Sequence, residues 1–305
     1  MYKRQGETQD SALVAIERTK GSLIGVDVAR TRLVAALAEQ SAPDDPSARC
    51  AIEQAVFDAL AHHAKLPLWA LFGGALGELE TDMTIPTGST AHARTSARAI
   101  VERGISTLKI KIGAVEMDED VERVRAAAQE ADGARIVIDA NGAYTPREAV
   151  ELVEALRVHG IHVALFEQPV AADDLDGLAR VTRDASVSVC ADESARTVAD
   201  VLAIVERRAA TAINIKLMKS GVACAMEMVA IAKAAGLELM IGGMVESILS
   251  MTFSAHFACG LGGFAYADLD TPLFIRSSPF QGGFRLDRGR IALDGIERGV
   301  GVTLA

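Results

Sequence analysis

The stretch Thr107-Leu108-Lys109-Ile110-Lys111-Ile112-Gly113 is the feature around which the rest of the chain is interpreted. Lysines alternate with apolar residues, which is typical of a strand, and period two places Lys109 and Lys111 on the same face. Two neighbouring ammonium groups repel each other, and each favours the neutral form of the other. An exposed hairpin would solvate such a pair without consequence, but the flanking leucine and isoleucines indicate a covered strand. The stretch alone supports a functional and a surface role about equally.

Strand-like runs alternate with helical runs from residue 81 onward. Eight runs have the composition of strands: Asp82–Pro86, Thr107–Ile112, Ala134–Asp139, Val163–Glu167, Ser186–Ala191, Ala212–Leu217, Glu238–Gly242 and Phe264–Asp268. Helical stretches such as Asp118–Gln129, Pro146–His159 and Gly221–Ala235 lie between them. This alternation predicts a parallel sheet with right-handed crossovers, and eight units indicate closure into a (β/α)8 barrel. An open doubly wound sheet is the alternative, but no GxGxxG motif follows the first strand.

The two ends of the chain lie outside this alternation. Helical runs precede residue 81, and Gly-rich turns with short alternating runs extend from Phe280 to Leu304. We expect the two ends to meet in one small domain beside the barrel. The predicted fold is therefore α/β, a modified TIM barrel of the (β/α)7–8 type with a partial α+β capping domain. Its predicted parts are a partial N-terminal capping domain (1–80), the barrel (81–275) and a C-terminal segment that returns to the capping domain (276–305).

Composition excludes several classes of protein. The 305 residues carry a net charge of −10 without a basic block, which argues against binding to nucleic acid or to an anionic membrane surface. No apolar run is long enough to span a bilayer, and no signal-peptide pattern is present, so we expect a cytoplasmic protein. The cysteines show no CxxC spacing and are interpreted as buried free thiols: Cys50, Cys190, Cys224 and Cys259. We interpret His256 as a structural residue.

Three acids end or directly follow consecutive predicted strands, namely Asp139, Glu167 and Asp192. The carboxyl ends of barrel strands form the catalytic face, so these side chains are expected to converge there. Converging carboxylates repel one another unless a cation lies between them, and all-oxygen ligands favour Mg²⁺ or Mn²⁺. Each acid could instead cap the helix that follows it. Capping explains one acid well, but it explains three in succession poorly.

Lys216, in the run Ala212–Leu217, is expected to lie across the barrel mouth from the first lysine pair. A substrate held on a metal ion would then face one lysine on each side. This arrangement suits removal of a proton next to a carboxylate and its return from the opposite side. The base must be neutral to accept a proton, and we expect Lys109, Lys111 and the metal to lower lysine pKa values through their positive charge.

The type and order of these residues resemble the pattern of the enolase superfamily, and within it the muconate-lactonizing-enzyme subgroup. The residues that carry the resemblance are Lys109, Lys111, Asp139, Glu167, Asp192 and Lys216. The likeness extends from about Gly6 to the end of the chain. It implies an enolase-type barrel that binds one Mg²⁺ per subunit through the three acids. It also implies that Lys111 and Lys216 carry protons to and from a metal-stabilised enolate.

Within the subgroup the chain is most similar to dipeptide epimerases of the L-Ala-D/L-Glu type. The motif Asp268-Leu269-Asp270 at the end of the last strand implies a site for the α-ammonium group of a dipeptide. An Asp-rich turn explains the motif taken alone, but it is the weaker interpretation beside the other motifs. The resemblance further implies that substrate is contacted by Thr84, Lys109, Gly243, Val245, Asp268 and Asp270. Asn141 and Glu193 are expected to support the metal ligands.

Two alternatives to dipeptide epimerisation stay open. One is another reaction of the subgroup: muconate cycloisomerisation, o-succinylbenzoate synthesis or N-acylamino acid racemisation. The other is a catalytically inert metal-binding barrel. Within the resemblance, Tyr2–Thr8 corresponds to a stretch that follows the first strands of the capping domain, so we expect a truncated N-terminus and an incomplete cap. For partners, we expect a small dipeptide and further copies of the chain in a homo-oligomer.

Overall fold

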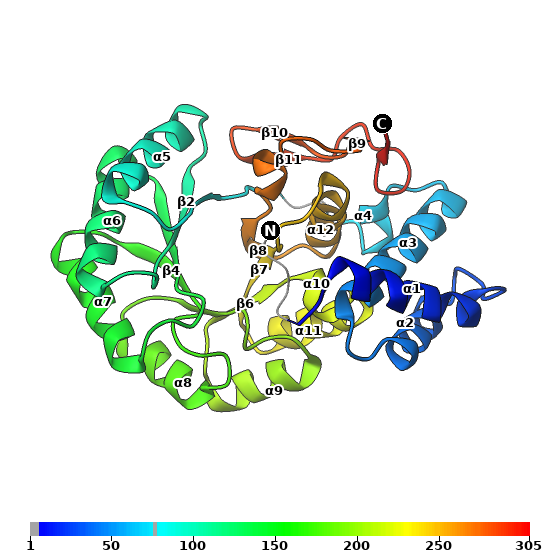
Figure 1. Ribbon diagram of the computed structural model, residues 1–305, viewed down its shortest axis with the longest axis horizontal. Coiled ribbons are helices and arrows are strands. Elements are labelled where there is room, and N and C mark those ends of the chain that lie inside the picture. Colours follow the sequence, from blue (N-terminus) through cyan, green and yellow to red (C-terminus); the bar gives the residue numbers. More distant parts are fainter. Residues whose placement is uncertain (1–5, 76–77) are drawn as a thin grey trace.

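The computed structural model describes residues 6–75 and 78–305, and its centre is a sheet of eight parallel strands that pair in chain order (Figure 1). The strands are β1 (Met83–Ile85), β2 (Thr107–Lys111), β3 (Arg135–Asp139), β4 (Val163–Glu167), β5 (Val189–Ala191), β6 (Ala212–Ile215), β7 (Glu238–Gly242) and β8 (Phe264–Asp268). All eight predicted strands are confirmed, although β1, β2, β3, β5 and β6 are shorter than predicted. Strand β6 stops early because a helical turn, α10 (Leu217–Ser220), begins directly after Lys216.

The first and last strands of the sheet lie close together. The backbone N–H of Asp82, just before β1, donates to the carbonyl of Ala267 in β8 at 2.8 Å. The N–H of Leu269, just after β8, donates to the hydroxyl of Thr81 at 2.9 Å. These bonds bring the two edges of the twisted parallel sheet together, as barrel closure requires. The predicted TIM-barrel class is therefore confirmed, and the open doubly wound sheet is excluded.

Helices cover the outside of the barrel, and α5 to α9 form an arc around the strands in Figure 1. The helices of this layer are α5 (Thr90–Glu102), α6 (Met117–Glu130), α7 (Pro146–Val158), α8 (Leu175–Asp184), α9 (Val198–Arg207), α11 (Val222–Ala234) and α12 (Ile248–Leu261). Small side chains on their inner faces, such as Ala93 and Ala97 of α5, allow close packing on the sheet. No helix in the described ranges is long and apolar enough to cross a membrane.

Side chains fill the inside of the barrel. One buried cluster takes a residue from each strand between β3 and β8: Val137, Leu165, Cys190, Ala212, Met240 and Tyr266. Inward-pointing residues packed in this way make the barrel a core and not a pore. The prediction of free cysteines is confirmed, since all four thiols are free and only that of Cys224 is not fully buried.

The N-terminal and C-terminal segments contact each other beside the barrel. The N-terminal helices are α1 (Gln9–Leu23), α2 (Thr31–Ser41), α3 (Pro46–Ala64) and α4 (Leu68–Leu71); the later elements are η1 (Thr271–Phe274), β9 (Phe280–Gly282), β10 (Arg285–Asp287), β11 (Arg290–Ala292) and β12 (Val302–Leu304). Gly299 exchanges backbone hydrogen bonds with Leu66 and Leu68, each 2.9 Å long. The division of the chain at residues 80 and 275 stays a prediction, and Met1–Gln5 lie outside the described residues.

His256 on α12 links these two segments. Its Nδ1 accepts the backbone N–H of Trp69 at 3.2 Å, and its Nε2 lies 3.3 Å from the carbonyl of Val300. The ring is fully buried, so it fits a neutral imidazole that donates through Nε2. Burial lowers the pKa of His256 to about 4, despite the bond to Val300. These contacts support the structural role predicted for His256.

The buried histidine predicts a loss of stability in mild acid. Because its pKa is lower in the folded state than in the unfolded state, the unfolded chain binds the extra proton first. The contribution is complete above pH 6.5 and falls as the pH drops toward 4, by roughly 3 kcal/mol in all. Denaturant unfolding of wild type and His256→Gln at pH 7 and pH 4.5 should show a smaller pH difference for the variant. The exposed His63→Gln should match wild type, and an identical pH difference in His256→Gln would contradict the prediction.

Candidate active site

Most of the predicted site residues lie at the carboxyl ends of the barrel strands. Asp139 and Glu167 are the last residues of β3 and β4, and Asp268 is the last residue of β8. Asp192 follows β5 directly, and Lys216 follows β6. Since parallel strands end at one edge of a barrel, residues far apart in sequence meet there.

Lysine ammonium groups lie among the three candidate metal ligands. Lys109 Nζ is 3.1 Å from Asp139 Oδ2 and 2.7 Å from Glu167 Oε2. Lys216 Nζ is 4.0 Å from Glu167 Oε1 and 2.5 Å from Asp192 Oδ2. Each ammonium group therefore bridges two acids, and Glu167 stands between the other two. The three acids form a buried row, with no side chain more than 2% exposed.

The donor set of this row fits a hard divalent cation. All candidate ligand atoms are carboxylate oxygens, which Mg²⁺ prefers. Glu167 Oε2 is buried and has no hydrogen-bond partner among the described residues, although Lys109 lies within ion-pair distance. Burial, followed by the charge of Asp139, raises the pKa of Glu167 to about 7. A positive ion beside this oxygen would supply what the buried carboxylate lacks.

A different group of acids lies closest together. Among the described residues, Asp82, Asp268 and Asp270 each offer one oxygen within 4.8 Å of the others, whereas Asp139, Glu167 and Asp192 do not form such a group. Lysine side chains lie between the latter three acids, which explains their wider spacing. Asp82 was not among the predicted site residues. Its signal in the sequence was a charged residue at the start of a predicted buried strand.

The Asp-x-Asp motif lies against the first two strands. Asp268 Oδ2 accepts from Lys109 Nζ at 2.6 Å, and Asp270 Oδ2 accepts the backbone N–H of Thr84 at 2.7 Å. Burial and the charge of Asp268 raise the pKa of Asp270 to about 7. Asp82 Oδ1 has no hydrogen-bond partner in the described chain, and burial raises the pKa of Asp82 well above its ordinary value. Near Thr84 the carboxylates therefore outnumber the positively charged groups that could neutralise them.

The lysines lie on the inner side of the barrel mouth, as predicted, but their electrostatics differ from the prediction. Burial alone would lower the pKa of Lys216, yet the carboxylates of Asp192 and Glu167 hold it above its ordinary value. The pKa of Lys109 is likewise raised, because the carboxylates of Asp268 and Glu167 outweigh the effect of burial. For Lys109 and Lys216 the neighbouring lysines alone therefore do not lower the pKa, since carboxylates lie closer to these two ammonium groups; the effect expected of the metal stays a prediction.

Lys111 is the more open of the two candidate proton carriers. Its side chain is 27% exposed, and its Nζ donates to Asp139 Oδ2 at 2.5 Å and to Asn141 Oδ1 at 3.0 Å. Asn141 donates in turn to Glu193 Oε1 at 3.0 Å, and its own N–H bonds Asp139 Oδ1. Asn141 therefore lies beside a candidate ligand and a candidate lysine, and Glu193 contacts Asn141; their supporting role stays a prediction.

Three further polar residues hold the acids and were not predicted. Lys219 is buried and donates to the Asp192 carboxylate at 2.7 Å and to the carbonyls of Asp192 and Asn214. The amide of Asn214 donates to Glu167 Oε1 at 2.7 Å, and Gln168 Oε1 accepts the N–H of Asp192 at 2.9 Å. No spacing in the sequence signalled Lys219, because Lys216 has extended backbone after β6 and Lys219 lies in the helical turn that follows.

Gly243 and Val245 lie in the loop after β7. Val245 is 46% exposed, and neither residue forms a hydrogen bond with the lysines or acids in the described part of the chain. A Cβ on Gly243 would lie 2.3 Å from Met251 Cε, so a larger residue there would require the Met251 side chain to shift. The structure places both residues at the same end of the barrel as the acids, but it provides no contact that joins them to the site.

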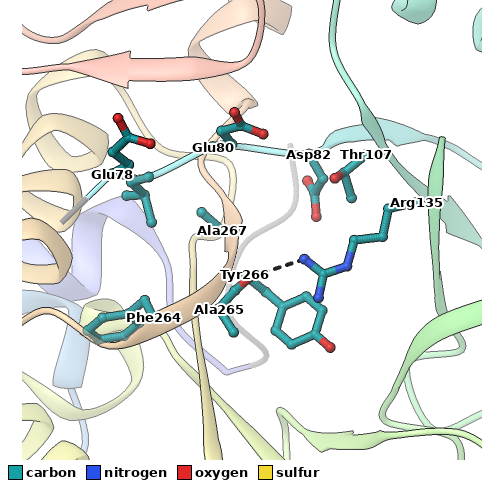
Figure 2. A pocket seen from close by; sticks show the side chains of 10 residues that line it. Glu78, Glu80, Asp82, Thr107, Arg135, Phe264, Ala265, Tyr266 and Ala267 are labelled. Atoms are coloured by element: carbon teal, nitrogen blue, oxygen red, sulfur yellow. Dashed lines mark hydrogen bonds between the residues drawn. The ribbon is translucent and has the colours of Figure 1, made fainter. Parts of the chain in front are cut away.

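A cavity of about 230 Å³ lies at the opposite end of the barrel (Figure 2). It is bordered by residues at the starts of strands, including Thr107 and Arg135, and by Glu78, Glu80 and Asp82. The guanidinium of Arg135 stacks 4.1 Å above the ring of Tyr266 and donates to the carbonyl of Ala265. The lysines and most of the candidate acids lie at the other edge of the sheet, so this cavity is not the catalytic mouth.

Comparison with known families gives two matches that together cover most of the chain. Residues 5–73 match the family described as mandelate racemase / muconate lactonizing enzyme, N-terminal domain. Residues 92–305 match the family described as enolase C-terminal domain-like. The second match covers the barrel strands from β2 onward, with every candidate lysine and acid except Asp82.

Characterised relatives carry related names. The chain is 47% identical over 300 residues to an aromatic dipeptide epimerase of Herpetosiphon aurantiacus, covering 98% of this chain and 84% of the relative. It is 39% identical over 291 residues to an L-Ala-D/L-Glu epimerase of Thermotoga maritima, covering 95% and 84%. The crystal structure of a dipeptide epimerase from Enterococcus faecalis, complexed with Mg and L-Leu-L-Tyr, superimposes with a TM-score of 0.93 at 33% identity, covering 98% of this chain and 84% of that one.

Proposed function

The chain belongs to the mandelate racemase / muconate lactonizing enzyme family, and from this we propose that it epimerises dipeptides with the help of Mg²⁺. One observation carries the proposal: Lys111 and Lys216 each contact a different end of a single buried row of acids, at Asp139 and Asp192. A substrate carboxylate drawn to a cation on that row would have one lysine on each side. The names of the relatives point in the same direction.

We assign the two lysines as proton carriers. In one direction Lys111 would accept the α-proton, while Lys216 would donate a proton to the same carbon from the opposite face; the reverse reaction exchanges the roles. After one turnover the α-carbon is inverted, one lysine has gained a proton and the other has lost one. Asp139, Glu167 and Asp192 would hold the Mg²⁺, which when bound stabilises negative charge on the substrate carboxylate. A cation there would also offset the carboxylates that now raise the pKa of Lys216.

The remaining predicted residues would bind the substrate or hold the lysines and metal ligands in place. Asp268 and Asp270 would receive the α-ammonium group of the dipeptide, since carboxylates outnumber cations around them. Thr84, Lys109, Gly243 and Val245 would contact the substrate, and Asn141 with Glu193 would hold Lys111 and Asp139 in place.

We further propose one Mg²⁺ per subunit, a homo-oligomer, a cytoplasmic location, and no nucleic acid or membrane partner. The net charge of −10 supports the last point.

Deuterium exchange tests the proposal and identifies the substrate. The protein is incubated in D₂O with Mg²⁺ and a panel that includes L-Ala-L-Glu, L-Leu-L-Tyr and L-Ala-L-Phe. Deuterium at one α-carbon, together with formation of the epimer, is expected for at least one dipeptide and is followed by proton NMR. Absence of exchange with every dipeptide would favour the inert metal-binding barrel. The aromatic and glutamate members of the panel separate the activities named for the two relatives.

Asp268→Asn should separate dipeptide epimerisation from the other reactions of the family. Loss of the charge that would face the ammonium group is expected to lower kcat/KM for a free dipeptide about 100-fold, mainly through KM. An N-acetylated dipeptide lacks that ammonium and should be affected less. The exposed Asp287→Asn on β10 serves as a control. Undiminished dipeptide activity in Asp268→Asn would argue for a reaction that needs no ammonium site.

A further inference from the structure

A buried ion pair lies behind the end of strand β2, outside the site described above. Asp120 and Arg123, one turn apart on α6, are 0% and 1% exposed, and Arg123 Nη1 is 2.7 Å from Asp120 Oδ1. Removing two charges from water is costly, and apolar residues of the same volume often give equal or greater stability. Stability alone is therefore a poor explanation for a pair in this position.

The guanidinium of Arg123 connects the ends of two strands. Nη1 donates to the carbonyl of Lys111 at 2.9 Å, and Nη2 donates to the carbonyl of Pro86, directly after β1, at 3.0 Å. A planar guanidinium presents its donors in a fixed geometry, so these two bonds set the spacing of the strand ends. The bond to Lys111 acts on the backbone from which that side chain extends into the catalytic mouth.

The carboxylate of Asp120 fixes the loops on either side. Its Oδ2 accepts the N–H of Gly113 at 2.6 Å and the hydroxyl of Tyr144 at 2.8 Å. Gly113 has a positive φ of 86°, and a Cβ there would lie 2.4 Å from the Cβ of Ala143, so the turn needs glycine to reach Asp120. The Tyr144 loop also carries Asn141, which accepts a hydrogen bond from Lys111 Nζ.

Lys111 depends on this backbone support more than Lys216 does. The Lys216 side chain is 6% exposed, whereas that of Lys111 is 27% exposed and less constrained by packing. We propose that Asp120, Arg123 and Tyr144 form a positioning cluster that holds Lys111 at the angle needed for proton transfer on one face of the substrate. This inference rests on the proposed function for the role of Lys111. The cluster acts through Lys111 and does not touch the substrate.

Tyr144→Phe tests the cluster with the smallest change, since it removes only the hydroxyl that Asp120 accepts. Deuterium exchange is measured separately for the two epimers of one dipeptide, and Lys111→Ala shows which epimer depends on Lys111. In Tyr144→Phe the exchange rate of that epimer should fall about 10-fold or more, a size usual for loss of an orienting hydrogen bond. The rate of the other epimer should stay within about twofold. Arg123→Lys keeps the positive charge but loses the planar guanidinium with its paired donors, so it should also lower the exchange rate of the epimer that depends on Lys111.

Two controls separate positioning from general damage. Arg125→Met removes an exposed ion pair with Glu122 on the same helix and should leave the ratio of the two rates unchanged. Val201→Ala, in a fully buried position on α9, should lower the Tm without changing that ratio. Equal loss of both rates in Tyr144→Phe, or a ratio matching that of Val201→Ala, would overturn the inference.

A labelling measurement keeps the inference independent of turnover. Lys111 is acetylated with acetic anhydride at a rate read by mass spectrometry, with the exposed Lys65 as internal reference. In Tyr144→Phe and Arg123→Lys the relative rate for Lys111 should change at least about threefold, while that for Lys216 stays constant. This change in a protein that epimerises no dipeptide would uphold the cluster and reject the proposed function. Unchanged labelling in an active enzyme would reject the cluster alone.

Discussion

Lys216→Ala is expected to lower kcat for epimerisation by about 10³-fold, which lies within the usual contribution of general acid–base catalysis. Lys216 Nζ lies 2.5 Å from Asp192 Oδ2 and 4.0 Å from Glu167 Oε1, at one end of the acid row. Without this amine one face of the substrate has no proton carrier. The epimer whose α-proton faces Lys111 should still exchange with D₂O, but without inversion.

Substitution of the other lysine, Lys111→Ala, makes this expectation specific. Lys111→Ala should likewise stop epimerisation, while leaving exchange on the epimer that Lys216 serves. The two variants should therefore preserve exchange on opposite epimers, as read by NMR for each purified epimer. Lys20→Ala, an exposed lysine on α1, is the control for loss of a positive charge. If both variants preserved exchange on the same epimer, the placement of the lysines on opposite faces would be wrong.

Glu167→Gln is expected to weaken Mg²⁺ binding at least about 100-fold and to abolish measurable epimerisation. Glu167 is the middle acid of the row, and its Oε2 has no hydrogen-bond partner among the described residues. Calorimetry measures the affinity directly, without any need for turnover. The rise in Tm that Mg²⁺ causes in wild type by binding the folded state should be absent from the variant.

The same substitution should not harm the fold in the absence of metal. The pKa of Glu167, raised to about 7 mainly by burial, exceeds its unfolded value of 4.5, so ionised Glu167 destabilises the folded state as the pH rises between these values. At pH 8 the metal-free variant should therefore be at least as stable as metal-free wild type. Glu53→Gln is a matched control, because Glu53 is also buried with a raised pKa and lies under α11, where it accepts the N–H of Ala223. Equal weakening of Mg²⁺ binding in Glu53→Gln would contradict the assignment.

Most of the fold could be predicted because its signals are local. Strand β4, for example, is an apolar run that ends in an acid, with a proline two residues later, and it was placed at its observed bounds. Bounds were wrong where tertiary contacts shorten a run, as at Ser186–Ala191, where only Val189–Ala191 pairs with neighbouring strands. The resemblance to the muconate-lactonizing subgroup rested on residues at the strand ends, and the family matches confirm it.

The supporting parts of the site could not be predicted in the same way. Arg123 and Tyr144 lie on an ordinary amphipathic helix and in an ordinary loop, and their importance depends on contacts with Lys111 and Asp120. Asp82 carried only a weak signal at the start of a strand. Each becomes visible when the fold shows which buried polar groups have partners and which do not.

The sequence by itself determined the barrel and the order of its acids and lysines, because alternation of strands and helices, and the residue that ends each strand, are properties of neighbours along the chain. Only the tertiary structure decided which charges meet. Lys109 contacts Asp268, 159 residues away, and Lys216 contacts Asp192, so the carboxylates raise lysine pKa values that the neighbouring lysines were expected to lower. The reason is that electrostatic energy falls with distance in space, and barrel closure sets that distance.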